Sequence, residues 1–136
     1  MADLFVDTNV FLRFLTNDDP AKASKIEAVF RKAVTGKISL ITTPLVIAEI
    51  VWTLESYYDL AKPDIESKVN TILNTPNLTV SEHSVLLQAL DLYASRNVDF
   101  IDAYNALAMH QMGVRRILTY DRKHFSRFEW VERVEP

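Results

Sequence analysis

The sequence predicts an α/β fold in three layers, with a mostly parallel central sheet of about four or five strands. Short runs rich in apolar and β-branched residues alternate along the chain with longer segments that have the spacing of amphipathic helices. The 136 residues are 49% hydrophobic and 24% charged, which excludes a disordered or fibrous chain. This length indicates one domain over residues 1–136.

The expected elements follow one another in the order of βαβ units, and for this reason we expect parallel pairing. The strand candidates are residues 4–6, 38–42, 78–80, 116–119 and 130–134. The helix candidates are residues 9–15, 21–34, 45–58, 65–74, 85–96, 101–112 and, as a short turn, 122–125.

Glycines and prolines mark the expected helix ends. Gly36 and Gly113 follow periodic segments and precede β-rich runs, as helix-terminating glycines with a left-handed backbone do. Pro20, Pro44 and Pro63 follow polar or flexible residues and suit the first turn of a helix.

Composition excludes several classes of protein. Because the chain contains no cysteine, it has no disulfide framework, thiolate zinc site or cysteine nucleophile. The net charge of -3 means that nucleic-acid binding would need a local basic patch. The apolar stretches are shorter than the roughly 18–20 residues that span a bilayer, and the N-terminus lacks the features of a signal peptide. We expect a cytoplasmic protein without membrane contact.

Four acidic residues stand at unusual positions. Asp7 and Asp121 follow predicted strands, at the sheet edge where α/β proteins bind ligands. Glu49 is the only ionisable residue in the apolar segment 44–54, so we expect a largely apolar helix face around it, and Asp102 begins another apolar helix. A buried carboxylate needs a cation, a basic partner or a proton.

Structural roles remain open for each of these acids. Asp7 and Asp121 can cap the helices that follow them, and Asp99 is a suitable N-cap with Asp102 near the positive helix end. Glu49 can pair with an arginine elsewhere in the chain.

If the acids converge, their mutual repulsion requires a cation among them. Oxygen ligands without cysteine or paired histidines favour Mg²⁺ or Mn²⁺ over zinc. Such sites commonly serve phosphoryl chemistry, because the ion holds phosphate oxygens and activates water.

Four segments in this order resemble PIN-domain ribonucleases, and among them the VapC-type toxins of toxin–antitoxin pairs. They are FVDTNVFL (residues 5–12), VIAE (46–49), DFIDAYNALA (99–108) and LTYD (118–121). The resemblance covers essentially the whole chain and implies a PIN-like α/β/α domain.

The resemblance also implies the roles of individual residues. Asp7, Glu49, Asp102 and Asp121 match the four acidic positions of the family, which hold Mg²⁺ or Mn²⁺, Glu49 through water or by orienting the attacking water. Asp99 matches a secondary acid. Supporting positions are Thr8, Asn9 and Thr119.

By resemblance, the activity is metal-dependent endoribonuclease cleavage that leaves 5′-phosphate and 3′-hydroxyl ends. The implied partners are an RNA substrate, a small antitoxin and a second copy in a homodimer. A non-catalytic PIN-like scaffold that binds RNA or protein is the alternative.

Basic residues near the acidic motifs are candidate RNA contacts, although a solvated basic face explains them equally well. They are Arg13, Arg115, Arg116, Arg122, Lys123 and Arg127. His124 follows Asp121 closely, but a lone surface histidine is more often a bystander. The apolar helix 45–58 carries Trp52, Tyr57 and Tyr58, for which core packing is expected first and a protomer interface second.

Overall fold

A three-stranded parallel sheet organises the first of two units into which the chain divides, with the boundary between His83 and Ser84. The structure is a computed structural model that describes residues 2–136. Strands β1 (Ala2–Phe5), β2 (Ile38–Thr42) and β3 (Leu78–Val80) pair side by side in that order.

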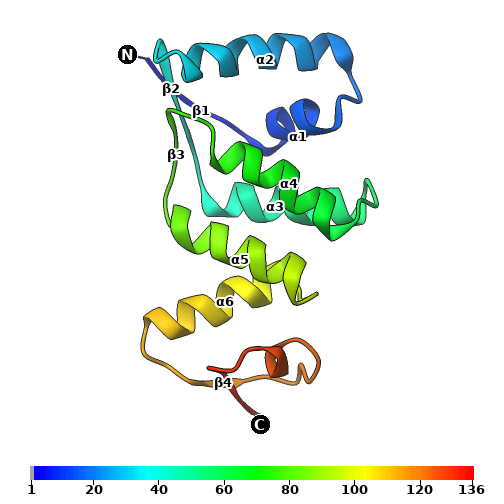
Figure 1. The fold of residues 1–136 in the computed structure, drawn as a ribbon, viewed down its shortest axis with the longest axis vertical. Helices are drawn as coiled ribbons and strands as arrows, with labels where there is room; N and C mark the ends of the chain where they lie inside the picture. The colour runs from blue at the N-terminus through cyan, green and yellow to red at the C-terminus, as the bar shows by residue number, and fades with distance from the viewer. Residues whose placement is uncertain (1) are drawn as a thin grey trace. The chain divides into compact units, whose positions relative to one another are not determined.

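Pairs of helices connect successive strands of this sheet (Figure 1). Helices α1 (Thr8–Thr16) and α2 (Pro20–Val34) lead from β1 to β2, and α3 (Pro44–Ser56) and α4 (Lys62–Leu73) lead from β2 to β3. Helix α1 packs against α2 and α3, and α3 packs against α4. Fully buried apolar residues of this unit are Phe11, Ala33, Leu40, Ile47, Ile50, Leu54, Ile65, Val69 and Ile72.

The second unit contains most of α5 (His83–Ser95), α6 (Phe100–Gln111) and a two-stranded parallel sheet. Strand β4 (Arg116–Leu118) pairs with β5 (Glu132–Val134), and the short 3₁₀ helix η1 (Phe125–Arg127) lies between them in sequence.

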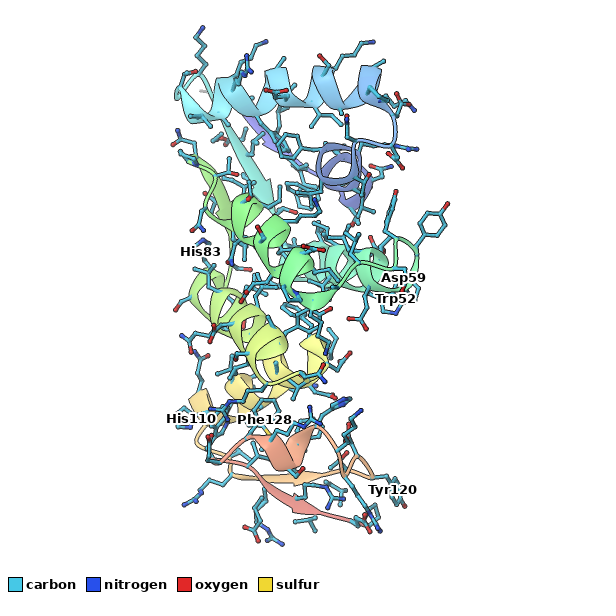
Figure 2. The ribbon with its side chains drawn as sticks, turned by 45° about the vertical axis from the view of Figure 1, so that its right-hand side comes forward. Trp52, Asp59, His83, His110, Tyr120 and Phe128 are labelled. Atoms are coloured by element: carbon cyan, nitrogen blue, oxygen red, sulfur yellow. The ribbon has the colours of Figure 1, made fainter. Side chains whose placement is uncertain are left out.

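An aromatic cluster fixes the C-terminal part of this unit. Phe128, labelled in Figure 2, is buried, and its ring centroid lies 6.2 Å from that of Phe125 and 5.3 Å from that of Trp130. The indole N–H of Trp130 donates to the carbonyl of Ala106 at 2.8 Å, which ties this segment to α6. No helix in the described part of the chain has the length and apolar character needed to cross a membrane.

The predicted α/β fold with parallel strands is confirmed, and all five predicted strands are present. Instead of one central sheet, the strands form a sheet of three and a sheet of two, one in each unit. Apolar runs identify strands, but their partners depend on which segments the chain places alongside them. A single domain over the whole chain stays a prediction.

Most predicted helix ends are confirmed. Pro20, Pro44 and Pro63 lie in the first turns of α2, α3 and α4. Gly36 and Gly113 have φ angles of 81° and 74°, the left-handed conformation that glycine adopts without steric cost. The short helix predicted at 122–125 instead occupies Phe125–Arg127. The helix begins later in the sequence because Asp121 accepts hydrogen bonds from the N–H groups of Lys123 and His124.

Candidate active site

Asp7 lies between β1 and α1, in a segment that the neighbouring strand holds in place. The buried hydroxyl of Thr42 donates to the carbonyl of Val6 at 2.9 Å, and the N–H of Val6 donates to the carbonyl of Ile41 at 2.8 Å. The Oδ1 atom of Asp7 accepts the backbone N–H of Thr8 at 2.8 Å, and Asp7 is the N-cap of α1. The capping role is therefore real, and it uses one of the two carboxylate oxygens.

The two residues after Asp7 lie in different environments. Thr8 is buried and contacts Asp7 through its backbone N–H. Asn9 is exposed and lines a groove on α1 and α2. Their predicted role in supporting Asp7 stays a prediction for the side chains.

Glu49 lies on the exposed face of α3, so the expected burial on an apolar face is wrong. The buried face of α3 carries Ile47, Ile50 and Leu54, whereas Leu45 next to Glu49 is 81% exposed. Leu45 and Trp52, on the same side of the helix as Glu49, face solvent, and composition alone does not distinguish such a side from a core face. The carboxylate of Glu49 makes no ion pair with any residue that the structure describes, so the proposed arginine partner is absent there.

Asp99 and Asp102 divide two roles at the start of α6. The Oδ2 atom of Asp99 accepts the N–H groups of Ile101 at 3.1 Å and Asp102 at 3.3 Å, which confirms Asp99 as the N-cap. Asp102 is left free of that role. Burial raises the pKa of the Asp102 carboxyl above its ordinary value, and the negative charges of Asp99 and Asp121 raise it further.

Asp121 is fixed by its own loop. The hydroxyl of Thr119 accepts the N–H of Asp121 at 3.0 Å, in agreement with a supporting role for Thr119. The Oδ1 atom of Asp121 accepts the N–H groups of Lys123 and His124, each at 2.9 Å, and holds residues 122–124 in a turn before η1. These bonds, that of His124 first, lower the pKa of Asp121 and keep it a carboxylate.

His124 joins Asp102 and Asp121 in one cluster. Its Nδ1 atom lies 3.1 Å from Oδ2 of Asp102 and 3.2 Å from Oδ2 of Asp121. The three side chains are 27%, 20% and 29% exposed in the order His124, Asp102, Asp121. One ligand atom from each lies within 4.8 Å of the others, a spacing that can hold a metal ion.

The cluster suits a cation on chemical grounds as well. Two carboxylates direct one oxygen each to the same nitrogen, and the pKa of Asp102 is raised partly by the charge of Asp121. Positive charge at this point relieves that repulsion. The residues present therefore fit a divalent ion, and an imidazole nitrogen lies beside the predicted carboxylate oxygens.

The predicted acids are thus distributed over both units. The second unit brings Asp102 and Asp121 together, with His124 between them. The first unit carries Asp7 at the start of α1 and Glu49 on α3, and these two helices pack against each other. The sequence analysis treated His124 as a bystander, although its position three residues after Asp121 indicated that the two side chains could meet.

Arg122 and Arg127, two of the predicted RNA contacts, bind other groups of the protein. Arg122 makes an ion pair with Glu135, with Nε 2.8 Å from Oε1. The guanidinium of Arg127 donates to the backbone carbonyls of Arg96 and Asn97, a structural role. Arg115, Arg116 and Lys123 are exposed and make no ion pair with the described residues.

A basic groove of about 310 Å³ on α1 and α2 begins at Asn9, two residues after Asp7. Arg13 in its wall pairs with Asp18 at 3.2 Å, and Lys22 lies 3.9 Å from Asp19. The sequence analysis identified Arg13 but missed Lys22 and Lys25, which lie in none of the acidic motifs. These lysines line the groove because α2 packs against α1. The lining residues are Asn9, Val10, Arg13, Lys22, Lys25 and Ile26.

Trp52 on α3 and Tyr57 directly after it are not core residues, contrary to the first expectation. Trp52, labelled in Figure 2, is 69% exposed and Tyr57 is 78% exposed. Tyr58 is half-buried, and its hydroxyl donates to Asp18 at 2.7 Å. The core face of α3 is filled by aliphatic residues, whereas Trp52 is exposed to solvent.

Known proteins share this sequence pattern. The model of the PIN domain matches residues 4–131. The VapC ribonuclease of Aquifex aeolicus (strain VF5) is 30% identical over 118 residues, which cover 87% of each chain. Among solved structures, VapC20 of Mycobacterium tuberculosis, a toxin that cleaves the sarcin–ricin loop, aligns with 15% identity. That alignment covers 88% of this chain and 91% of VapC20, with a TM-score of 0.40.

The raised pKa of Asp102 predicts how the metal-free fold responds to its removal. A raised pKa means that the folded state disfavours the carboxylate, so stability is lost as pH rises from 3.8 through the folded-state pKa. Asp102→Asn should therefore increase the free energy of unfolding at pH 7, and the gain should shrink as pH falls toward 4. Urea unfolding in EDTA at several pH values measures this difference. Asp91→Asn, at an exposed acid on α5, is the control, and an unchanged or lower stability of Asp102→Asn at pH 7 would contradict the prediction.

Proposed function

The chain belongs to the PIN-domain family, among its VapC-type ribonucleases, and from this premise we propose that it is a divalent-metal-dependent endoribonuclease that hydrolyses RNA phosphodiester bonds. The observation that carries the proposal is the cluster of Asp102, Asp121 and His124, whose ligand atoms can hold a cation. We further propose that it is the toxin of a type II toxin–antitoxin pair and acts in the cytoplasm.

We propose for the four acids the roles that the family resemblance implies. Asp7 and Asp102 would be principal ligands of Mg²⁺ or Mn²⁺, and Asp121 would bind directly or through a water molecule. Glu49, exposed and without an ion pair among the described residues, would orient the attacking water or bind through water. A bound divalent ion supplies positive charge for phosphate oxygens and lowers the pKa of water. Asp99 supports Asp102 as the helix cap beside it.

Neutral variants of the acids test the proposal directly. Asp7→Asn and Asp102→Asn should each reduce RNA cleavage by about 100-fold or more, because each removes a negative ligand while asparagine still caps α1 in place of Asp7. Cleavage of a radiolabelled structured RNA with Mg²⁺, with Mn²⁺ and with EDTA measures the effect, and Asp91→Asn is the control. Full cleavage by Asp7→Asn in EDTA would refute the metal-nuclease proposal. RNA binding by the wild-type chain without any cleavage would favour the scaffold alternative.

The basic groove on α1 and α2 is the best-supported RNA contact. It combines three cationic side chains beside Asn9, and Lys25 makes no ion pair with the residues that the structure describes. Lysines bind phosphates without reading sequence. We propose that this groove holds the RNA backbone next to Asp7, while the loop residues Arg115, Arg116 and Lys123 supply further charge.

Charge reversal in the groove tests this assignment. Lys25→Glu should weaken RNA binding similarly for different sequences and reduce the slope of log K against log salt by about one. Fluorescence anisotropy in EDTA measures binding without cleavage. Lys37→Glu introduces the same charge change at an exposed lysine after α2, outside the groove, and serves as the control. Equal effects of the two variants would leave only a general charge effect and contradict the groove.

The exposed side of α3 supports the proposed homodimer. Leu45 and Trp52, seven residues apart on one side of the helix, are 81% and 69% exposed, and Tyr57 follows at its end. Large apolar side chains gathered on one solvent-facing side are typical of an interaction surface. The small antitoxin is a separate partner, which would use a basic side chain to pair with the acids and compete with the ion.

A substitution on this helix tests the dimer. Trp52→Glu should convert the dimer to a monomer at micromolar concentration, because it places a charge within an apolar interface. Light scattering coupled to size-exclusion chromatography measures the mass. The control is Tyr120→Glu, which places the same charge at an exposed aromatic residue of the second unit and should leave the dimer intact. A wild-type monomer at high micromolar concentration would contradict the proposal.

A further inference from the structure

His124 is placed as a ligand and not as a bystander. Its Nδ1 atom faces one oxygen from each of two different carboxylates, Asp102 at 3.1 Å and Asp121 at 3.2 Å. We propose that His124 supplies a nitrogen ligand to the divalent ion and that the site therefore prefers Mn²⁺, and other first-row transition ions, over Mg²⁺. This inference rests on the proposed metal dependence and goes beyond the four acids.

The backbone around His124 holds the imidazole in this position. The N–H of His124 donates to Oδ1 of Asp121 at 2.9 Å, so the two residues are locked in one turn. The next residue, Phe125, is buried and begins η1, which fixes the chain on the other side. A side chain between two such restraints loses little freedom when it binds an ion, which favours binding.

Each carboxylate has one oxygen available to bind an ion beside His124. Asp121 uses Oδ1 for backbone N–H groups and directs Oδ2 to the imidazole. Asp102 likewise directs Oδ2 to it, while the helix cap is provided by Asp99. The three side chains are all partly shielded from solvent, which strengthens electrostatic attraction for a cation.

The other two histidines lack this environment. His110, labelled in Figure 2, is exposed on α6 and stacks edge-on against Trp130 with ring centroids 6.0 Å apart. His83, also labelled there, places Nε2 2.6 Å from the carbonyl of Leu73. Neither is near two carboxylates in the described structure, so His110 offers a matched control within the same unit.

A nitrogen ligand changes the preference among ions. Mg²⁺ is a hard cation that favours oxygen ligands and dehydrates reluctantly. Imidazole binds first-row transition ions, whose affinity rises from Mn²⁺ to Cu²⁺. If His124 only donated a hydrogen bond to the carboxylates, its removal would affect Mg²⁺ and Mn²⁺ alike.

The decisive experiment compares binding of the two ions without any RNA. Isothermal titration with Mg²⁺, and Mn²⁺ titration followed by electron paramagnetic resonance, are performed on the wild-type chain, His124→Gln and His110→Gln. His124→Gln should reduce Mn²⁺ affinity by about tenfold or more and change Mg²⁺ affinity much less, because glutamine replaces the nitrogen with an oxygen. His110→Gln should leave both affinities unchanged. An unchanged ratio of Mn²⁺ to Mg²⁺ affinity in His124→Gln would overturn the inference.

A second readout does not depend on the variant. In the ¹⁵N spectrum of the wild-type imidazoles, Zn²⁺ should shift Nδ1 of His124 and leave the resonances of His110 in place. A shift confined to the other histidines would overturn the inference.

If the wild-type chain binds the ions and cleaves RNA but His124→Gln keeps the wild-type ratio of Mn²⁺ to Mg²⁺ affinity, only the ligand role of His124 fails. Absence of any ion binding to the wild-type chain would overturn the metal dependence too.

Discussion

Repulsion between neighbouring carboxylates is the constraint on which the site depends. Asp102 and Asp121 direct oxygens to one imidazole nitrogen, an arrangement that costs free energy unless positive charge or hydrogen-bond donors offset it. The protein distributes this cost unevenly. Backbone N–H groups lower the pKa of Asp121, whereas burial and neighbouring charge raise the pKa of Asp102. Positive charge between the two carboxylates would offset this repulsion.

Capping and ligation are compatible because a carboxylate has two oxygens. Asp7 uses Oδ1 at the start of α1, and Asp121 uses Oδ1 in its turn and Oδ2 toward His124. At α6 the two tasks are divided between residues, since Asp99 caps the helix and Asp102 remains available. A capping role for these acids therefore does not exclude a role as metal ligands.

Charge number alone does not identify a nucleic-acid surface. Arg127 lies close to Asp121 in sequence, yet its guanidinium donates to the backbone carbonyls of Arg96 and Asn97. Lys22 and Lys25 are distant from every acidic motif in sequence, yet the packing of α2 on α1 places them in a groove that begins at Asn9. A cation contributes to phosphate binding only where its own protein leaves it accessible, and the fold decides this.

The sequence by itself determined the α/β class, the five strands and the helix ends at Pro20 and Gly113, and it singled out the four acids as candidates. These follow from local rules, since periodicity, φ preferences and capping chemistry act over a few residues. Only the tertiary structure decided the strand partners, the exposure of Glu49 and the meeting of His124 with Asp102, 22 residues away in the chain. Exposure and contact depend on which face of a helix packs against a neighbour. In the apolar helix α3, Ile47 is buried and Trp52 is exposed, and composition does not distinguish the two faces.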